Sequence, residues 1–184
     1  MKTLYIEGSA ETDNGNLREA FSKLLAKELK GKMPQIIMGG GKNQTIDKFH
    51  STPLKSKEER FLLFDSDCSL PDKKTICGGF NREKPNRKIS ATVENTFLMI
   101  QEVEAWILSQ PDVLTNAGID MSKFDCSNTE TISKPCEKLA DLYKKSGKVY
   151  TKVCEFVKVF PKLNTSKLKQ ACPEFCALID ALNK

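Results

Sequence analysis

Histidine is almost absent from this sequence, which has His50 alone among 184 residues. Zinc sites draw their ligands from clustered cysteines and histidines. The seven cysteines are scattered, and the closest pair, Cys172 and Cys176, lies on a predicted helix. Cys68 has no histidine near it in sequence to activate its thiol. We therefore expect neither structural zinc nor a cysteine nucleophile, and we expect His50 to lie at the surface.

Long hydrophobic runs and a paired cysteine framework are also missing. No run approaches the roughly 18 apolar residues that a membrane-spanning helix needs. The odd number of cysteines differs from the pattern of a small secreted domain. Because Met1 and Lys2 lead straight into a strand-like segment, we expect an unsecreted, cytoplasmic protein with reduced thiols. With 39% hydrophobic residues, the chain suits one compact domain.

A nucleotide-binding phosphate loop is absent as well. Gly39, Gly40 and Gly41 precede Lys42, but the Walker motif G-x-x-x-x-G-K-[ST] needs a longer spacing and a final serine or threonine. Asn43 follows Lys42 in this sequence. The turn therefore predicts no nucleotide site.

Basic residues are present in slight excess, and they are unevenly distributed. The net charge is +5, from 29 basic and 24 acidic residues, which is compatible with a polyanionic partner without requiring one. A segment that also contains proline and glycine concentrates these residues. They are Lys73, Lys74, Arg82, Lys84, Arg87 and Lys88. We expect them to bind a nucleic-acid backbone, and a solvated surface loop is the alternative.

Short apolar runs alternate with amphipathic stretches in the first part of the chain. The runs that predict strands cover residues 4–6, 36–38, 61–64 and 97–100. Helical patterns cover residues 17–29 and 102–108, and then 112–117, 136–145, 150–160 and 167–182. We expect Trp106 to pack in the core. The order predicts an α/β fold with a mainly parallel, Rossmann-like central sheet flanked by helices and a helical C-terminal part.

Acidic residues stand where the predicted strands end. Glu7 ends the first strand, and Asp65 and Asp67 end the third. Glu102 and Glu104 follow the fourth, although helical spacing would turn at most one of this pair inward. In an open α/β sheet the carboxyl ends of the strands form the binding edge, so these segments should converge. The alternatives are a solvated strand end for Glu7 and a turn or helix cap for the two aspartates.

A converging set of carboxylates indicates a particular chemistry. Carboxylates in a poorly solvated site repel one another unless a cation or shared protons lie between them. Oxygen ligands without histidine or thiolate favour Mg²⁺ or Mn²⁺ over zinc. Mg²⁺ typically combines one or two carboxylates with water and substrate phosphate. The pattern therefore predicts a divalent-cation site and a phosphate-bearing substrate.

These residues resemble the signature of the Toprim family. Leu-Tyr-Ile-Glu-Gly, which ends at Gly8, and Asp-Ser-Asp, which ends at Asp67, look like the two Toprim motifs. A closer resemblance is to bacterial standalone Toprim-like proteins that are related to overcoming-lysogenization-defect nucleases and associated with restriction or anti-phage systems. The matching segments are Ile6–Gly8 with Glu11, Ile100–Trp106 and Ala171–Phe175.

The resemblance implies a single Toprim-like domain over residues 1–184, with a core of about residues 1–110 and a helical extension over about residues 111–184. It implies a metal-dependent nuclease acting on DNA or RNA. Membrane association is not expected. The related proteins often operate beside an ATPase partner, so a partner protein is an expectation here too.

The resemblance also assigns roles to individual acids. Glu7 would be a metal ligand or general base, and Asp65 and Asp67 would bind the metal that neutralises the scissile phosphate. Glu11 and Glu104 would be further metal ligands. The related sequences continue as Glu-Gly-x-Thr-Glu-Glu, whereas Ala10 and Thr12 stand here, so the second metal site departs from the family pattern.

Two other functions remain open from the sequence. The run that ends in Asp65 and Asp67 also resembles the haloacid-dehalogenase phosphatase motif, in which the first aspartate attacks phosphate and the second is an acid. That motif usually continues with Gly-Thr, whereas Cys68 and Ser69 stand here. The second alternative is a Toprim-like module that binds nucleic acid or a partner without catalysis.

Overall fold

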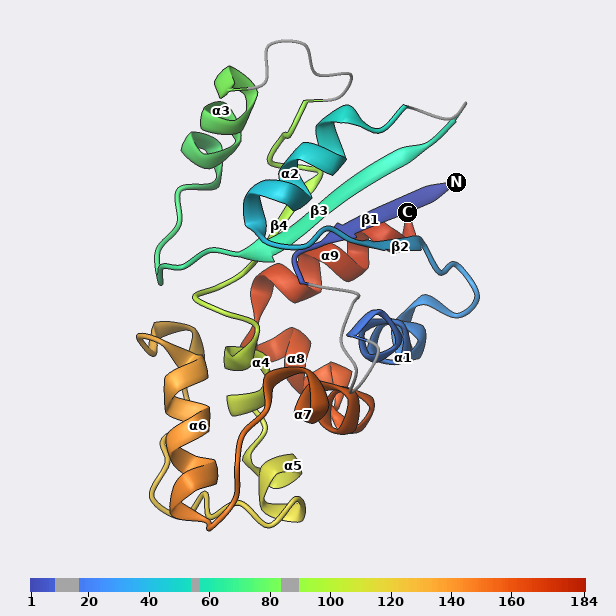
Figure 1. The fold of residues 1–184 in the computed structure, drawn as a ribbon. Coiled ribbons are helices and arrows are strands. Elements are labelled where there is room, and N and C mark those ends of the chain that lie inside the picture. The colour runs from blue at the N-terminus through green and yellow to red at the C-terminus, as the bar shows by residue number, and fades with distance from the viewer. Residues whose placement is uncertain (9–16, 54–56, 84–89) are drawn as a thin grey trace.

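The computed structural model describes residues 1–8, 17–53, 57–83 and 90–184. Within these residues, a four-stranded sheet in the order β2-β1-β3-β4 forms the centre of the molecule (Figure 1). The strands are β1 (Lys2–Ile6), β2 (Gln35–Met38), β3 (Glu59–Asp65) and β4 (Thr96–Met99). Every neighbouring pair is parallel, which confirms the predicted α/β class and its Rossmann-like sheet.

Helices cover both faces of the sheet, which explains the unbroken apolar runs in the middle of its strands. Adjacent residues of a strand face opposite sides. Leu4 belongs to a buried cluster with residues of α1 and α9, whereas Tyr5 belongs to a second cluster with residues of α2 and α3. These helices are α1 (Leu17–Leu29), α2 (Lys42–Ser51), α3 (Lys73–Glu83) and α9 (Pro173–Asn183). Figure 1 shows α1 and α9 on the side of the sheet opposite to α2 and α3.

The rest of the C-terminal part is helical, as predicted. It contains α4 (Glu104–Leu108), α5 (Pro111–Asn116), α6 (Pro135–Lys145), α7 (Lys152–Val159) and α8 (Thr165–Ala171), with short 3-10 turns at Thr129–Thr131 and Phe160–Lys162. Trp106 is buried, with its ring near those of Phe21, Phe160 and Phe175. The prediction that Trp106 packs in the core is confirmed.

Two helices differ from the sequence prediction. The basic segment from Lys73 forms the helix α3 rather than a loop, because the Asp72 carboxylate accepts the backbone N–H groups of Lys74 and Thr75 and so caps the first turn. The last helix is interrupted, so that α8 and α9 replace one continuous helix. Pro173 is the cause, because its ring disfavours helical backbone at the preceding residue.

His50 is buried, so the prediction of a surface histidine is wrong. Helix α2 buries His50 together with the neighbouring Phe49. The centroids of the two rings lie 5.2 Å apart. Across the described part of the chain, no helix is long and apolar enough to cross a membrane.

Candidate functional site

Glu7 and Asp65 meet because β1 and β3 are neighbours and both strands end at the same edge. The backbone N–H of Glu7 donates to the carbonyl of Leu63 at 2.9 Å, which continues the strand pairing up to the site. The backbone N–H of Asp65 then donates to Oε2 of Glu7 at 3.0 Å. The predicted convergence of these two acids is therefore present in the structure.

The Asp65 carboxylate is also held from the end of β4. Its Oδ1 accepts the backbone N–H of Val103 at 2.9 Å. Burial raises the pKa of Asp65 to about 8; the positive charge of Lys152 opposes the shift, whereas the negative charges of Glu7 and Glu104 add to it. Burial also raises the pKa of Glu7, against the hydrogen bond from Asp65 and the charge of Lys42. Both acids therefore resist ionisation in the metal-free chain.

Asp67 does not line the cavity with this pair, although its negative charge adds to the raised pKa of Glu7. Its side chain is 67% exposed and forms an ion pair with Lys42, whose Nζ lies 2.6 Å from Oδ2. Asp67 has a positive φ of 57°, and its backbone N–H donates to the carbonyl of Gln101 at 2.9 Å. The aspartate therefore shapes the loop after β3 and does not line the cavity that contains Asp65.

Glu104 is a fully buried carboxylate beside the pair. It accepts Nζ of Lys152 at 3.0 Å and the hydroxyl of Tyr150 at 3.1 Å. The same carboxylate accepts the thiol of Cys136, and burial together with the charge of Glu104 raises the pKa of that thiol to about 12. Burial and the same charge raise the pKa of Tyr150. The partners of Glu104 therefore stay protonated near neutral pH.

Glu102 approaches the same position from the segment before α4. Its Oε2 accepts the backbone N–H of Cys136 at 2.7 Å, at the start of α6. One ligand atom from each of Glu102, Glu104 and Cys136 lies within 4.8 Å of the other two, so this cluster could hold a metal ion. The prediction that helical spacing separates the two glutamates is wrong, because α4 begins only at Glu104.

Glu7, Asp65 and Lys152 line a common cavity of about 240 Å³, whereas Glu104 is reached from it only through its contact with Lys152. Its polar lining comes from Glu7, Asp65 and Lys152, with the backbone of Gly40 and Gly41. The remaining lining residues are Gly8, Leu17, Phe21, Met99, Val103 and Phe156. A small group that enters this cavity would meet the carboxyl groups of Glu7 and Asp65 and the ammonium group of Lys152.

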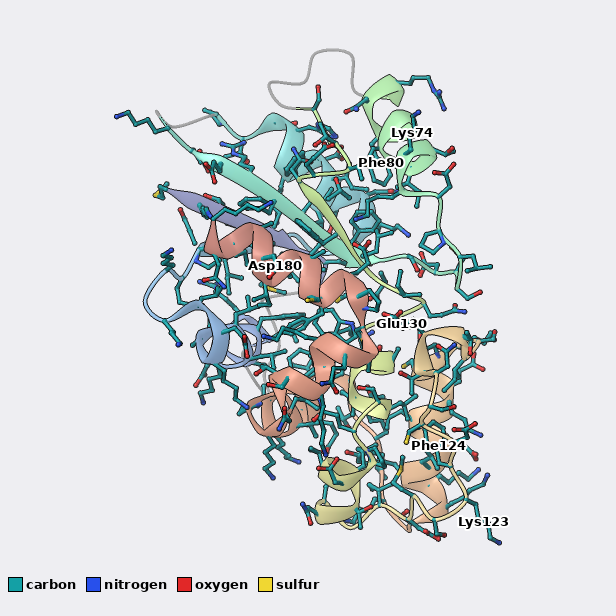
Figure 2. The ribbon with its side chains drawn as sticks, turned by 180° about the vertical axis from the view of Figure 1, so that it is seen from behind. Lys74, Phe80, Lys123, Phe124, Glu130 and Asp180 are labelled. Atoms are coloured by element: carbon teal, nitrogen blue, oxygen red, sulfur yellow. The ribbon has the colours of Figure 1, made fainter. Side chains whose placement is uncertain are left out.

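The predicted basic residues lie in different settings. Lys73 is paired with Glu174 of α9 at 2.7 Å and is largely buried, so this ammonium is engaged inside the fold. Lys74 and Arg82 are exposed on α3, and Figure 2 labels Lys74 there. Glu11, Lys84, Arg87 and Lys88 lie outside the described residues.

The sequence prediction missed Lys152, Tyr150 and Cys136. The pattern predicts the helices that carry or adjoin them, but nothing in it indicates that these side chains face the acids. Lys152 and Glu104 are 48 positions apart, and only the packing of α7 brings them together. Lysines are numerous in the chain, so residue type gave no signal.

A family model described as a domain of unknown function, DUF4276, matches residues 7–183. The chain belongs to the DUF4276 family. The match begins at Glu7 and extends into α9, so Asp65, Glu104 and Lys152 lie inside the DUF4276 domain. No curated protein and no solved structure matches the chain.

Proposed function

We propose that this DUF4276 chain is a divalent-cation-dependent nuclease that hydrolyses phosphodiester bonds in DNA or RNA. The observation that carries the proposal is the pairing of Glu7 with Asp65, two poorly solvated carboxylates, on one cavity with Lys152. Carboxylates so placed need a cation if both are to be ionised. The lysine on the same cavity suits a phosphate oxygen.

The donor chemistry of the site fits Mg²⁺ or Mn²⁺. Glu7 and Asp65 supply hard oxygen ligands. Their raised pKa values indicate that the metal-free chain surrounds them with too little water and positive charge to favour the ionised form. Glu102 and Glu104 supply further oxygens at the adjacent cluster. Cys136 is a soft ligand held protonated, so we assign the cation to the carboxylates and not to this thiol.

In the proposed reaction, the acids of the site and the nearby basic residues would have separate roles. Glu7 and Asp65 would hold the cation, which when bound would supply positive charge for the scissile phosphate and acidify a water molecule. Backbone N–H groups hold one oxygen each of Glu7 and Asp65, so the other oxygen of each carboxyl group would be left to bind a cation. Lys152 would donate to a phosphate oxygen. Lys74 and Arg82 would contact the flanking backbone.

The biological setting is part of the same proposal. The Toprim-like signature supports a role in an anti-phage or restriction-associated system, with an ATPase partner encoded elsewhere. If turnover requires such a partner, the isolated chain would cleave little or nothing. The test therefore includes a measurement that does not depend on turnover.

Two alternatives predict different results. A phosphatase that uses Asp65 and Asp67 has less support, because Asp67 is two-thirds exposed, paired with Lys42 and outside the cavity lining. A module that only binds nucleic acid would retain its affinity when the acids are neutralised.

The test is nicking of supercoiled plasmid and cleavage of labelled single-stranded DNA and RNA with Mg²⁺ or Mn²⁺. Wild type is compared with Glu7→Gln, Asp65→Asn and a matched control, Asp180→Asn. Asp180 is an exposed residue of α9 (Figure 2). We expect at least a hundredfold loss of cleavage in the first two variants and none in the control.

Isothermal titration with Mn²⁺ alone accompanies the cleavage assay. Metal binding by wild type that is lost in Asp65→Asn supports the cation site even if the chain needs a partner for turnover. Absence of both cleavage and metal binding in wild type would refute the proposal. Hydrolysis of a phosphomonoester that Asp67→Asn abolishes would favour the phosphatase.

A further inference from the structure

Lys152 contacts a carboxylate that also belongs to the possible metal cluster of Glu102, Glu104 and Cys136. Its Nζ lies 3.0 Å from Oε1 of Glu104 and 3.3 Å from Oε2, so that the ammonium contacts both oxygens of a fully buried carboxylate. Glu102 and Cys136 lie around the same carboxylate. A metal ion in this cluster and the ammonium of Lys152 would therefore compete for the same oxygens.

The two partners differ in their freedom to move. Glu104 has no exposed surface and also accepts the hydroxyl of Tyr150, so its carboxylate is fixed. The Lys152 side chain is 44% exposed and belongs to the first residue of α7. A lysine side chain has four rotatable carbon bonds, and its ammonium gains hydration when it leaves, which offsets part of the lost ion pair. If one partner moves, it is Lys152.

The cavity gives the ammonium a second place to go. Lys152 lines the cavity that contains Glu7 and Asp65, where the proposed function puts the scissile phosphate. Around this point stand the carboxylates of Glu7, Asp65, Glu102 and Glu104. A divalent cation at Glu102 and Glu104 would repel the ammonium, and a phosphate in the cavity would attract it.

We propose that Lys152 is an exchangeable counter-ion: it neutralises Glu104 in the metal-free chain, and it moves to the substrate phosphate when a divalent cation takes its place. The inference rests on the proposed nuclease function and adds a positioning role for the C-terminal part. Because linkage is reciprocal, metal at this cluster should strengthen phosphate binding, and phosphate should strengthen metal binding.

A purely structural ion pair makes a different prediction. If Lys152 only holds α7 against α4, its loss lowers the stability of the fold and leaves the intrinsic metal affinity unchanged or weaker. If Lys152 competes with the metal, its loss tightens metal binding. The sign of the change in affinity therefore separates the two roles.

The experiment is a titration with Mn²⁺ alone, followed by electron paramagnetic resonance of the free ion, on the full chain without substrate. Lys152→Met should bind one Mn²⁺ about tenfold more tightly than wild type, the factor for removing one competing charge-assisted hydrogen bond. Lys152→Arg should bind it more weakly, because a guanidinium holds a carboxylate with two donors. The control Lys158→Met changes another lysine of α7 and should match wild type.

Each outcome decides the matter. Equal Mn²⁺ affinity in wild type, Lys152→Met and Lys152→Arg would overturn the inference, and metal-dependent cleavage by wild type would leave the proposed function intact. If wild type neither binds Mn²⁺ nor cleaves, the proposed function fails as well. Should Lys152→Met not fold, the Arg variant keeps a cation beside Glu104 and decides alone. In the presence of metal, Lys152→Met should also raise the KM for a labelled oligonucleotide, and Lys158→Met should not.

Discussion

The ionisation of Asp65 should make the metal-free chain less stable as the pH rises. The folded-state pKa is about 8, against 3.8 for the ordinary group, because burial disfavours the carboxylate. The folded chain therefore binds more protons than the unfolded chain between these values. The stability that this group contributes is fully present below about pH 4 and is lost as the pH rises through about 8.

The size of the effect follows from the shift. About four pKa units correspond to at most about 6 kcal/mol at 1.36 kcal/mol per unit. Water that enters the cavity and the movement of nearby charges reduce this penalty, and we expect about 3 kcal/mol at pH 8.5. Asp65→Asn removes the titrating group, so the variant should gain stability over wild type as the pH rises, by about that amount.

Urea unfolding in the presence of a chelator and a reducing agent measures this difference. The fluorescence of Trp106, the only tryptophan and a buried one, reports unfolding. Free energies of unfolding for wild type, Asp65→Asn and Asp180→Asn are compared from pH 5 to pH 9, so that other titrating groups cancel. A difference between the first two that does not change with pH would refute the electrostatic account of the site.

Divalent cation extends the same experiment. If Mg²⁺ binds the ionised pair, its addition at pH 8 should stabilise wild type by mass action more than it stabilises Asp65→Asn, which keeps only the cluster of Glu102 and Glu104. The stabilisation should fall as the pH drops, because protons then compete for the carboxylates. Equal stabilisation of both proteins by Mg²⁺ would place the cation elsewhere.

Three further outcomes are expected. Arg60→Met should cost about 3–5 kcal/mol in urea unfolding, because it removes the buried guanidinium that pairs with the buried carboxylate of Glu58; a loss below about 1 kcal/mol would contradict this. Hydrogen bonds from α8 lower the pKa of Glu28, so wild type should lose stability as the pH falls through about 4, and Glu28→Gln should lose less over that range. Replacing Lys74 and Arg82 together with alanine should weaken binding to every nucleic-acid sequence and flatten its dependence on salt, whereas an unchanged salt slope in filter binding would remove α3 from the interface.

The sheet could be predicted because its strands are buried on both faces and so appear as unbroken apolar runs. Residues 61–64 are such a run, and the structure extends them only slightly into β3. Helix α3 was missed because Gly78 and Gly79 lower its helix propensity and its charges suggested a loop. The readable signal was Asp72, which caps the helix.

The candidate site was predictable only in part. The carboxyl ends of parallel strands lie at one edge of a sheet, independently of the loop conformations. Glu7 and Asp65 could therefore be placed at the same edge from their positions at the ends of two predicted strands. Asp67 could not be placed in this way, because it lies beyond the end of β3 and the direction of its side chain depends on the conformation of the loop. In the structure Asp67 has a positive φ, and its side chain pairs with Lys42. Lys152 depends on tertiary packing, for which a single sequence carries no local signal.

The C-terminal helices complete the site, so they are more than an appendage to the sheet. Helix α7 supplies Lys152, the first turn of α6 binds Glu102 through the N–H of Cys136, and α9 covers the apolar face that contains Leu4. A fragment that ends near residue 110 would expose this apolar face, which disfavours folding, and would remove Lys152, Tyr150 and Cys136 from Glu104. The order of the strands determines the positions of Glu7 and Asp65. The packing of the C-terminal helices determines the position of Lys152, whose charge balances Glu104. A substitution deep in the α7 interface should therefore alter metal affinity without touching a carboxylate.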